Sequence, residues 1–382
     1  MKLLNLPRAV IPIYGTTFAD TLGYTLMIPL LPTLVHQYHL SDVMGGALLS
    51  IPAFCSAVAA PIWGKISDRT GRKTIIMAAQ FLSLAGYLLL ALAHTPWLIL
   101  VSRIISGLGG GSLGAVESYI ADVTKEEDRE GAYAFYGAVF GLAFVIGPVT
   151  SGALIHYGVA LPFLVAAGLE TLNIIFTAFF LPLRTRAQQT RTSFTASLRA
   201  ANKPGVRVVF VRQFLFIFAV VCFLANFALF VSHTLRMDPA QASFVLATAG
   251  AIGGLTLLGV VTPLAGRFGD VFVSQAGLAM SFAAYVLLVF AAQPWIFFIA
   301  LVLWATGVAM VMPTLTTILS ERAPKEERGA IMGMSDSINS IAMIVGPSAG
   351  AAIVGADAKM LGVLPALASA IAFAVRWRRK PS

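Results

Sequence analysis

Charged residues are scarce in this sequence. Asp, Glu, Lys and Arg make up 11% of its 382 residues, whereas a typical soluble domain has about 25%. Hydrophobic residues make up 58%, and the mean hydropathy is +0.84. So little polar surface cannot cover a globule in water. The composition therefore excludes a soluble enzyme, a nucleic-acid-binding protein and a disordered chain, and it predicts an integral membrane protein.

Cysteine is also rare, and the patterns of nucleotide and metal sites are missing. Cys55 and Cys222 each lie in an apolar run, so we expect free thiols rather than disulfides or metal ligands. The sequence has no Walker A motif, which argues against transport driven by ATP. Gly109–Gly114 fits the pattern G-x-G-x-x-G, but it lies inside an apolar helix and follows no strand. The five histidines lack metal-ligand spacing, so we expect no metal and no cofactor.

Apolar runs separated by breakers predict an all-α integral membrane fold with twelve transmembrane helices. A membrane helix needs about 20 apolar residues, and about 32 residues are available for each of twelve spans. The first run is too long for a signal peptide and has no small-residue cleavage site, so we expect it to remain as a helix. The predicted spans are 8–33, 43–65, 73–93, 96–121, 130–156, 160–182, 208–231, 241–266, 271–292, 294–319, 328–353 and 357–377.

The net charge of +9 arises from basic residues between the spans. Lys and Arg cluster at 65–73, 184–212, 322–328 and 376–380. Alternating loops carry 23 basic residues on the side of the N-terminus and 2 on the other, Arg236 and Lys359. This asymmetry is typical of cytoplasmic loops rather than of nucleic-acid binding. We therefore expect both termini to be cytoplasmic.

The chain divides into two similar halves of six spans. A polar connection, 183–207, separates a predicted N-terminal bundle (1–182) from a C-terminal bundle (208–382). The two halves share three landmarks at offsets of 199, 198 and 202 residues: Glu127–Pro148 matches Glu326–Pro347, Pro96-Trp97 matches Pro294-Trp295, and Gly64–Asp68 matches Gly266–Asp270. Two pseudo-symmetric bundles with a substrate site between them are an architecture of secondary transporters.

Four motifs resemble those of the major facilitator superfamily, in its drug:proton antiporter branch with twelve helices (the tetracycline and multidrug efflux type). Gly64–Lys73 is similar to the signature loop of the superfamily, and Asp20-x-x-Gly23 to a motif of the first span. Arg103-x-x-Ser106-Gly107 is similar to a motif of the fourth span, although Ser106 replaces a frequent Gln. The antiporter motif of span five is matched, with Ser151 in place of one glycine, by Gly137, Gly141, Gly147, Pro148 and Gly152.

The resemblance implies that the signature loop gates the transporter. Asp68 would lie near the N-terminus of span eleven, whose helix dipole favours an anion. Arg72 would pair with Asp122 at the cytoplasmic end of span four. Apart from the resemblance, Arg69, Arg72 and Lys73 are expected to hold the loop at the anionic inner face, with a role in topology alone as the alternative. Gly64 and Gly71 would permit a tight turn. The glycines and Pro148 of span five would let a bent helix pack closely against its neighbours.

Five charged residues fall inside the predicted spans, and such charges are functional candidates because they are costly. They are Asp20, Arg103, Glu117, Glu170 and Asp336. A buried carboxyl group tends to hold a proton, and a nearby cation favours its release. Asp20 at mid-depth is our first candidate for proton coupling, with a helix-packing hydrogen bond as the alternative. Arg103, Glu117, Glu170 and Asp336 are candidates for coupling or substrate binding, and Glu117 could instead be an interfacial cap.

The sequence thus predicts a secondary active transporter and not an enzyme. We expect a proton-coupled antiporter that exports a small amphipathic or cationic compound by alternating access. The alternatives are a transporter of one metabolite, including an uptake symporter, and more distantly a membrane enzyme or a receptor that does not transport. We expect the protein to interact with its substrate, with protons and with the lipid bilayer, and not with nucleic acid. We expect a monomer in the cytoplasmic membrane of a bacterium.

Overall fold

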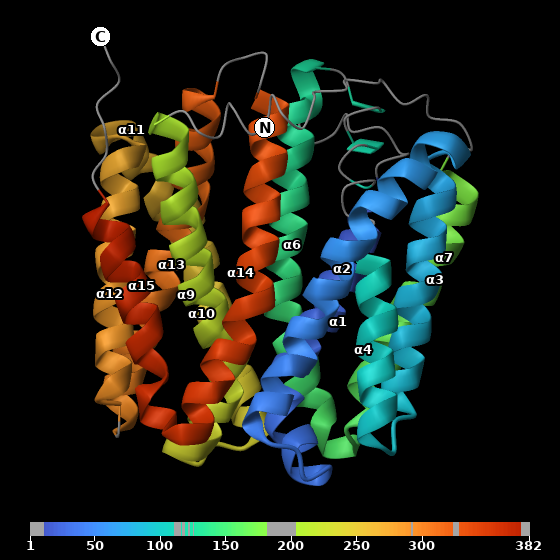
Figure 1. Ribbon diagram of the computed structural model, residues 1–382, viewed down its shortest axis with the longest axis horizontal. Helices are drawn as coiled ribbons and strands as arrows, with labels where there is room; N and C mark the ends of the chain where they lie inside the picture. Colours follow the sequence, from blue (N-terminus) through green and yellow to red (C-terminus); the bar gives the residue numbers. More distant parts are fainter. Residues whose placement is uncertain are drawn as a thin grey trace. The chain divides into compact units, whose positions relative to one another are not determined.

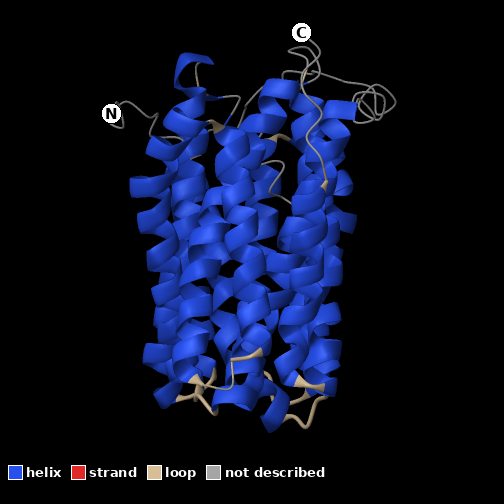
Figure 2. Cartoon of the chain, turned by 90° about the vertical axis from the view of Figure 1, so that its left-hand side faces the viewer, coloured by secondary structure: helices blue, strands red, loops and turns tan. Residues whose placement is uncertain are grey.

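The computed structural model describes residues 11–110, 126–181, 204–291, 293–323 and 328–375, together with 116, 119, 120, 123 and 124. Within these residues every regular element is a helix, and none is a strand (Figure 2). The all-α prediction is therefore confirmed for the described part of the chain.

The helices follow the predicted spans closely (Figure 1). Ten of those described are long and apolar enough to cross a membrane, and two shorter apolar helices, Pro96–Gly110 and Ala358–Ala374, lie at the fourth and twelfth predicted spans. The elements are α1 (Ile11–Gln37), α2 (Asp42–Thr70), α3 (Arg72–Ala91), α4 (Pro96–Gly110), α6 (Glu126–Leu154), α7 (Ala160–Phe180), α9 (Pro204–Leu235), α10 (Pro239–Thr256), η4 (Leu257–Val261), α11 (Thr262–Phe268), α12 (Asp270–Val289), α13 (Pro294–Arg322), α14 (Arg328–Ala356), η6 (Ala358–Gly362) and α15 (Val363–Ala374).

The predicted loop at 64–73 is a single residue. Helix α2 continues through Gly64 to Thr70, and α3 begins at Arg72. Gly71 joins them with φ +94° and ψ 153°, a conformation almost restricted to glycine. The expectation of a tight turn is confirmed at Gly71 but was wrong at Gly64, which is helical.

The second half repeats this junction and corrects the predicted register of the repeat. Gly269, with φ +81°, joins α11 to α12 just as Gly71 joins α2 to α3. Its offset from Gly71 is 198 residues, which agrees with the Pro96/Pro294 pair at the starts of α4 and α13. Pairing Gly64–Asp68 with Gly266–Asp270 was therefore wrong by one helical turn. In the correct register, Asp270 occupies the position of Arg72 as the first residue of its helix.

The chain forms two compact units. The first contains Met1–Ser41, Ala47–Gln189 and Asp238–Ala247, and the second contains Asp42–Gly46, Thr190–Met237 and Thr248–Ser382. In the first unit α1 packs on α6 and α7, and α3 packs on α4 and α7. In the second unit α9 packs on α14 and α15, and α12 packs on α13 and α15. The same pairing of equivalent helices in each unit is what an internal repeat requires.

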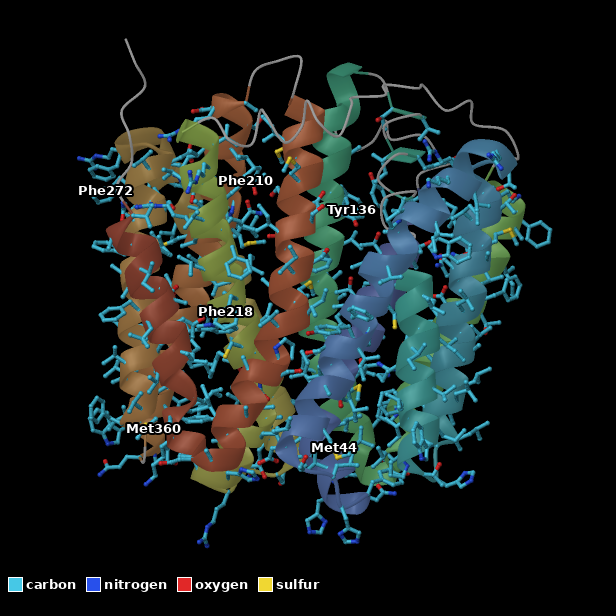
Figure 3. The ribbon with its side chains drawn as sticks, viewed as in Figure 1. Met44, Tyr136, Phe210, Phe218, Phe272 and Met360 are labelled. Atoms are coloured by element: carbon cyan, nitrogen blue, oxygen red, sulfur yellow. The ribbon has the colours of Figure 1, made fainter. Side chains whose placement is uncertain are left out.

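Two features of the second unit refine the predicted boundaries and surface. Helix α9 begins at Pro204, so the end of the predicted linker belongs to a helix. Large apolar side chains are exposed on the outer helices: Phe272 of α12 and Met360 of η6 project outward with exposed fractions of 50% and 45% (Figure 3). Apolar side chains exposed in such numbers are suited to contact with lipid.

Candidate functional site

The polar centre of the first unit is built around Asp20, nine residues after the start of α1 and about 14 Å along its axis. Its Oδ1 accepts a hydrogen bond of 2.8 Å from the Ser83 hydroxyl on α3. The side chain is half-buried. A carboxyl group at this depth with a neutral partner is poorly compensated as an anion, so the position favours a group that takes up and releases a proton.

Tyr87 lies one turn beyond Ser83 on α3 and fixes the approach of α3 to α1. Its hydroxyl donates to the carbonyl oxygen of Ala19 at 3.2 Å, and the side chain is 3% exposed. A Cβ atom on Gly23 would collide with the phenol ring of Tyr87. The Asp20-x-x-Gly23 motif therefore has a steric reason, because only glycine leaves room for the ring beside Asp20. The Tyr87 hydroxyl also lies within electrostatic range of Asp20, Glu170 and Arg103.

Glu170 enters the same centre from α7. It is 0% exposed, and neither of its carboxyl oxygens has a hydrogen-bond partner among the described residues. The Asn173 side chain, one turn further along α7, interacts with this carboxyl group. Asp20 lies close enough to act on Glu170 electrostatically. The structure thus brings together two carboxyl groups that lie 150 residues apart in the sequence.

A neutral hydrogen-bonded cluster, one helical turn from Asp20 toward the N-terminal end of α1, ties α1, α3 and α7 together. The Gln80 amide donates to Thr16 at 3.0 Å and to Thr177 at 2.9 Å. The Asn173 amide donates to Thr16 at 3.2 Å. All four side chains are buried. These contacts fix the helices that carry Asp20, Tyr87 and Glu170, because each polar group finds its partner only when the helices are in register.

Arg103 is the buried cation of the first unit. It lies on α4 with 3% exposure, and its Nε and Nη2 atoms have no hydrogen-bond partner among the described residues. Close packing fixes α4, because a Cβ on Gly107 would meet Pro52 and Cys55 of α2, and one on Gly109 would meet α3. The Ser106 hydroxyl, at the position of a frequent Gln, donates to the Arg103 carbonyl at 3.3 Å.

The other two intramembrane candidates do not join this centre in the described structure. Glu117 lies outside the residues whose side chains are described. Asp336 belongs to the second unit, on α14, and its side chain is exposed. Beside it Gln213 donates to Ser335 at 2.5 Å and to Asn339 at 2.8 Å. The polar segment around Asp336 therefore contacts α9 through Ser335 and Asn339, whereas the Asp336 side chain is exposed.

In this structure, Lys73 of the signature loop binds the C-terminal end of α7. Lys73 donates from Nζ to the carbonyl oxygens of Ala178 and Leu181 at 2.7 Å each, at the C-terminal end of α7. Arg72 donates from Nη1 to the Ser67 hydroxyl at 3.1 Å, and Arg69 is exposed. The Asp68 side chain and the whole of Asp122 lie outside the described residues, so their gating contacts remain predictions.

The antiporter motif of α6 divides into two parts. Near its C-terminal end, a Cβ on Gly147 would collide with Thr25 of α1, and one on Gly152 would crowd Ser243 of α10. Ser151, which replaces a glycine, donates to the Leu26 carbonyl at 3.1 Å, and Pro148 lies inside the helix. At Gly137 and Gly141, no described atom lies within 4 Å of the position that a Cβ would take. Close packing was therefore predicted correctly for Gly147 and Gly152, and for Gly137 and Gly141 it stays a prediction.

Sequence reasoning missed Tyr87, Ser83 and Gln80. Each is a polar residue inside the predicted third span, which was a usable signal. Their spacing of three and four residues also places them on one helix face. Selection by charge alone does not find these uncharged partners.

We predict that Gly23→Ala destabilises the protein by about 1–3 kcal/mol, because the new methyl group would displace the buried Tyr87 ring. Gly168→Ala on α7 is the matched control, since no described atom lies within 4 Å of its Cβ position and it is exposed. This control should be neutral or slightly stabilised. Thermal unfolding of both variants in detergent measures the difference, and equal melting temperatures would contradict the role given to Gly23.

The chain resembles known transport and resistance proteins in sequence and in fold. The chain is 30% identical over 365 residues to the class C tetracycline resistance protein of Escherichia coli, covering 92% of this chain and 91% of that protein. It is 25% identical to multidrug resistance protein 1 of Bacillus subtilis (strain 168), covering 94% of each. The fold resembles the solved structure of the human organic anion transporter MFSD10 (TETRAN), with a TM-score of 0.73, 19% identity and coverage of 97% and 100%.

A second solved structure and a family match complete the assignment. A bacterial homologue of the human lysosomal transporter Spinster has a TM-score of 0.79 at 14% identity, covering 96% of each chain. The family described as Major Facilitator Superfamily matches residues 13–235 and 209–382, which together span nearly the whole sequence. The chain therefore belongs to the major facilitator superfamily, in the branch of the tetracycline and multidrug resistance transporters.

Proposed function

We propose that this protein exports a small amphipathic compound from the bacterial cytoplasm in exchange for protons. The observation that carries the proposal is the pair of carboxyl groups in the first unit, Asp20 and Glu170. They lie at mid-membrane positions of α1 and α7 and act on one another electrostatically. The names of the relatives, which are resistance proteins against tetracycline and several drugs, support export rather than uptake.

The chemistry of exchange follows from the surroundings of these groups. Two carboxyl groups close together in a medium of low dielectric constant do not both stay ionised, so the centre holds at least one proton easily. Substrate that binds nearby with a positive or hydrogen-bond-donating group favours the ionised form and releases that proton. Protonation from the outer side then releases the substrate. A proton and the substrate therefore cannot bind at the same time, which is what antiport requires.

Purified protein in proteoliposomes tests this function. With an acidic lumen, an antiporter accumulates a fluorescent substrate in the lumen, whichever way the molecules are inserted. The probes are rhodamine 123 and rhodamine 110, with protein-free liposomes as the control for passive uptake. We expect accumulation that nigericin abolishes. Accumulation only when the outside is acidic would show symport and overturn the proposal, and gradient-independent equilibration would show that protons are not coupled.

The direction of insertion gives a further prediction. We infer from the count of 23 basic residues against 2 that both termini and the connection around residue 189 are cytoplasmic, in the inner membrane. In a background with Cys55 and Cys222 replaced by serine, Gln189→Cys should resist a membrane-impermeant maleimide in intact cells and react after permeabilisation. Arg236→Cys, on the opposite side, should react in intact cells. The reverse pattern would show that the topology is inverted.

A further inference from the structure

An apolar groove lies at the surface of the first unit, between α2, α3 and α4. Val58, Ile62 and Ile66 of α2 form one wall, and Leu82 of α3 and Leu108 of α4 form the other. The volume of this α2 groove is about 320 Å³. Val58 and Ile62 are 52% and 56% exposed, and they lie on a helix long and apolar enough to cross a membrane. The groove is therefore open to the molecules that surround the helices in a bilayer.

The groove arises from the way in which α2 approaches α4. Helix α2 is inclined relative to α3 and α4 (Figure 1). The helices α2 and α4 touch where a Cβ on Gly107 would meet Pro52 and Cys55. Further along α2, Trp63 donates from Nε1 to the Leu108 carbonyl at 2.7 Å. Because this bond satisfies the indole N–H, the side chains that line the groove present an apolar surface, which suits a hydrocarbon chain.

Two basic residues, Lys65 and Arg69, lie on the same face of α2 as the groove. This face, about 60° wide at 100° per residue, also carries Val58 and Ile62. The buried Ser67 lies on the opposite face, toward the interior of the bundle. Lys65 and Arg69 are exposed and lie about 4.5 and 10.5 Å beyond Ile62 along the helix axis. The apolar wall thus continues directly into two outward-facing cations.

The other two cations of the signature loop are already engaged within the protein. Arg72 donates to the Ser67 hydroxyl, and Lys73 donates to two carbonyl oxygens at the end of α7. These two contacts hold helices together, so they explain Arg72 and Lys73 without any ligand. Lys65 and Arg69 instead point away from the bundle at the end of an apolar groove, where a bilayer presents its headgroups.

We propose that the α2 groove is a binding site for one anionic phospholipid. An acyl chain lies along Val58 and Ile62, and the phosphate binds Lys65 and Arg69. A zwitterionic lipid is a poorer ligand, because its own ammonium group offsets the attraction between the phosphate and the two cations. A free anion would leave the apolar groove unfilled, and an uncharged apolar compound would leave the cations without an anion. The site goes beyond the proposed function and does not depend on the identity of the substrate.

Trp63 provides a natural reporter for this site, because its indole borders the groove. The full-length protein is reconstituted into phosphatidylcholine vesicles that contain a rising fraction of lipid with dibrominated acyl chains. Bromine quenches tryptophan fluorescence at close contact, and the difference between wild type and Trp63→Phe isolates the signal of Trp63. We expect dibrominated phosphatidylglycerol to quench this signal at a mole fraction about tenfold lower than dibrominated phosphatidylcholine requires.

Variants separate the two ends of the lipid. Lys65→Gln combined with Arg69→Gln should abolish the preference for phosphatidylglycerol and leave quenching by phosphatidylcholine unchanged. Ile62→Phe, which fills part of the groove, should reduce quenching by both lipids. Arg267→Gln is the matched control, because Arg267 is exposed and lies 198 residues after Arg69, at the equivalent position of the second unit. It should keep the full preference. If the double variant fails to insert, each single variant should lose about threefold.

Three results would overturn the inference. Equal quenching by the two lipids would show that the groove does not select a negative headgroup. A preference that survives when both cations are replaced would show that Lys65 and Arg69 do not bind the phosphate. Trp63 fluorescence that neither lipid quenches would show that no phospholipid chain enters the groove. Thermal unfolding in detergent confirms that each variant compared is folded.

Discussion

Asp20→Asn is expected to insert and fold normally but to lose accumulation driven by the pH gradient, by about tenfold or more. The amide has the shape of the carboxyl group and can accept the hydrogen bond from Ser83, which is 2.8 Å long in the wild type. It removes the cost of a charge at this depth, so stability should not fall. It cannot take up or release a proton in the working pH range, so exchange loses its driving force. Binding of a neutral compound should survive, because the shape of the site is unchanged.

The decisive measurement is proton release when substrate is added to purified protein in lightly buffered detergent. Wild type should release protons, and Asp20→Asn should release fewer. Asp357→Asn is the matched control, because Asp357 is exposed and its carboxyl group only accepts a hydrogen bond from Lys359 at the start of η6. If Asp20→Asn releases as many protons as the wild type, Asp20 is a packing residue. Glu170→Gln, in the same centre, is then the next variant to measure.

The second large effect is expected from Arg212→Met, which should destabilise the protein by about 2–4 kcal/mol. Arg212 lies on α9 and is 0% exposed. It donates from Nε and Nη2 to the Val375 carbonyl at 3.1 and 2.6 Å, and from Nη2 to the Phe373 carbonyl at 3.3 Å. Methionine fills similar space but leaves these carbonyls at the end of α15 without their donor. A cation at a helix C-terminus is also favoured by the helix dipole.

Arg207→Met provides the control, because Arg207 is an exposed arginine of the same helix. Unfolding of each variant in mixed detergent micelles gives the free-energy difference, with intrinsic tryptophan fluorescence as the signal. We expect the control to unfold as the wild type does. If Arg212→Met unfolds at the same denaturant fraction as Arg207→Met, the three hydrogen bonds contribute nothing to stability.

The sequence predicted the helices from apolar runs. It predicted several residues of the site from a simple rule, which is that a charged residue inside an apolar span is a functional candidate. Asp20, Arg103 and Glu170 were found in this way. The rule could not say that Asp20 lies beside Ser83 and Tyr87 of α3, because helix rotation and the approach of α3 to α1 are tertiary facts. The collision that requires Gly23 is visible only when both helices are placed.

Two errors have the same physical origin, since helix ends cannot be read from charge. Arg212 follows a basic segment and was therefore placed among the loop cations. Helix α9 in fact begins eight residues before Arg212, and the Arg212 side chain is buried. Gly64 and Gly266 were paired as loop glycines because each precedes an Asp four residues on. Only the positive φ of Gly71 and Gly269 shows where the helices actually break.

Lys73 and Arg212 have a consequence for engineering this transporter. Each cation holds the carbonyl end of the last helix of its bundle, Lys73 at α7 and Arg212 at α15, and does so from within that bundle. Tension applied to the chain after Leu181 or after Val375 is therefore resisted at an anchor before it reaches the polar centre. Fluorescent proteins, affinity tags or a protease site should be tolerated just beyond these two anchors. The same attachments placed before the anchors would pull directly on the helix ends that Lys73 and Arg212 hold.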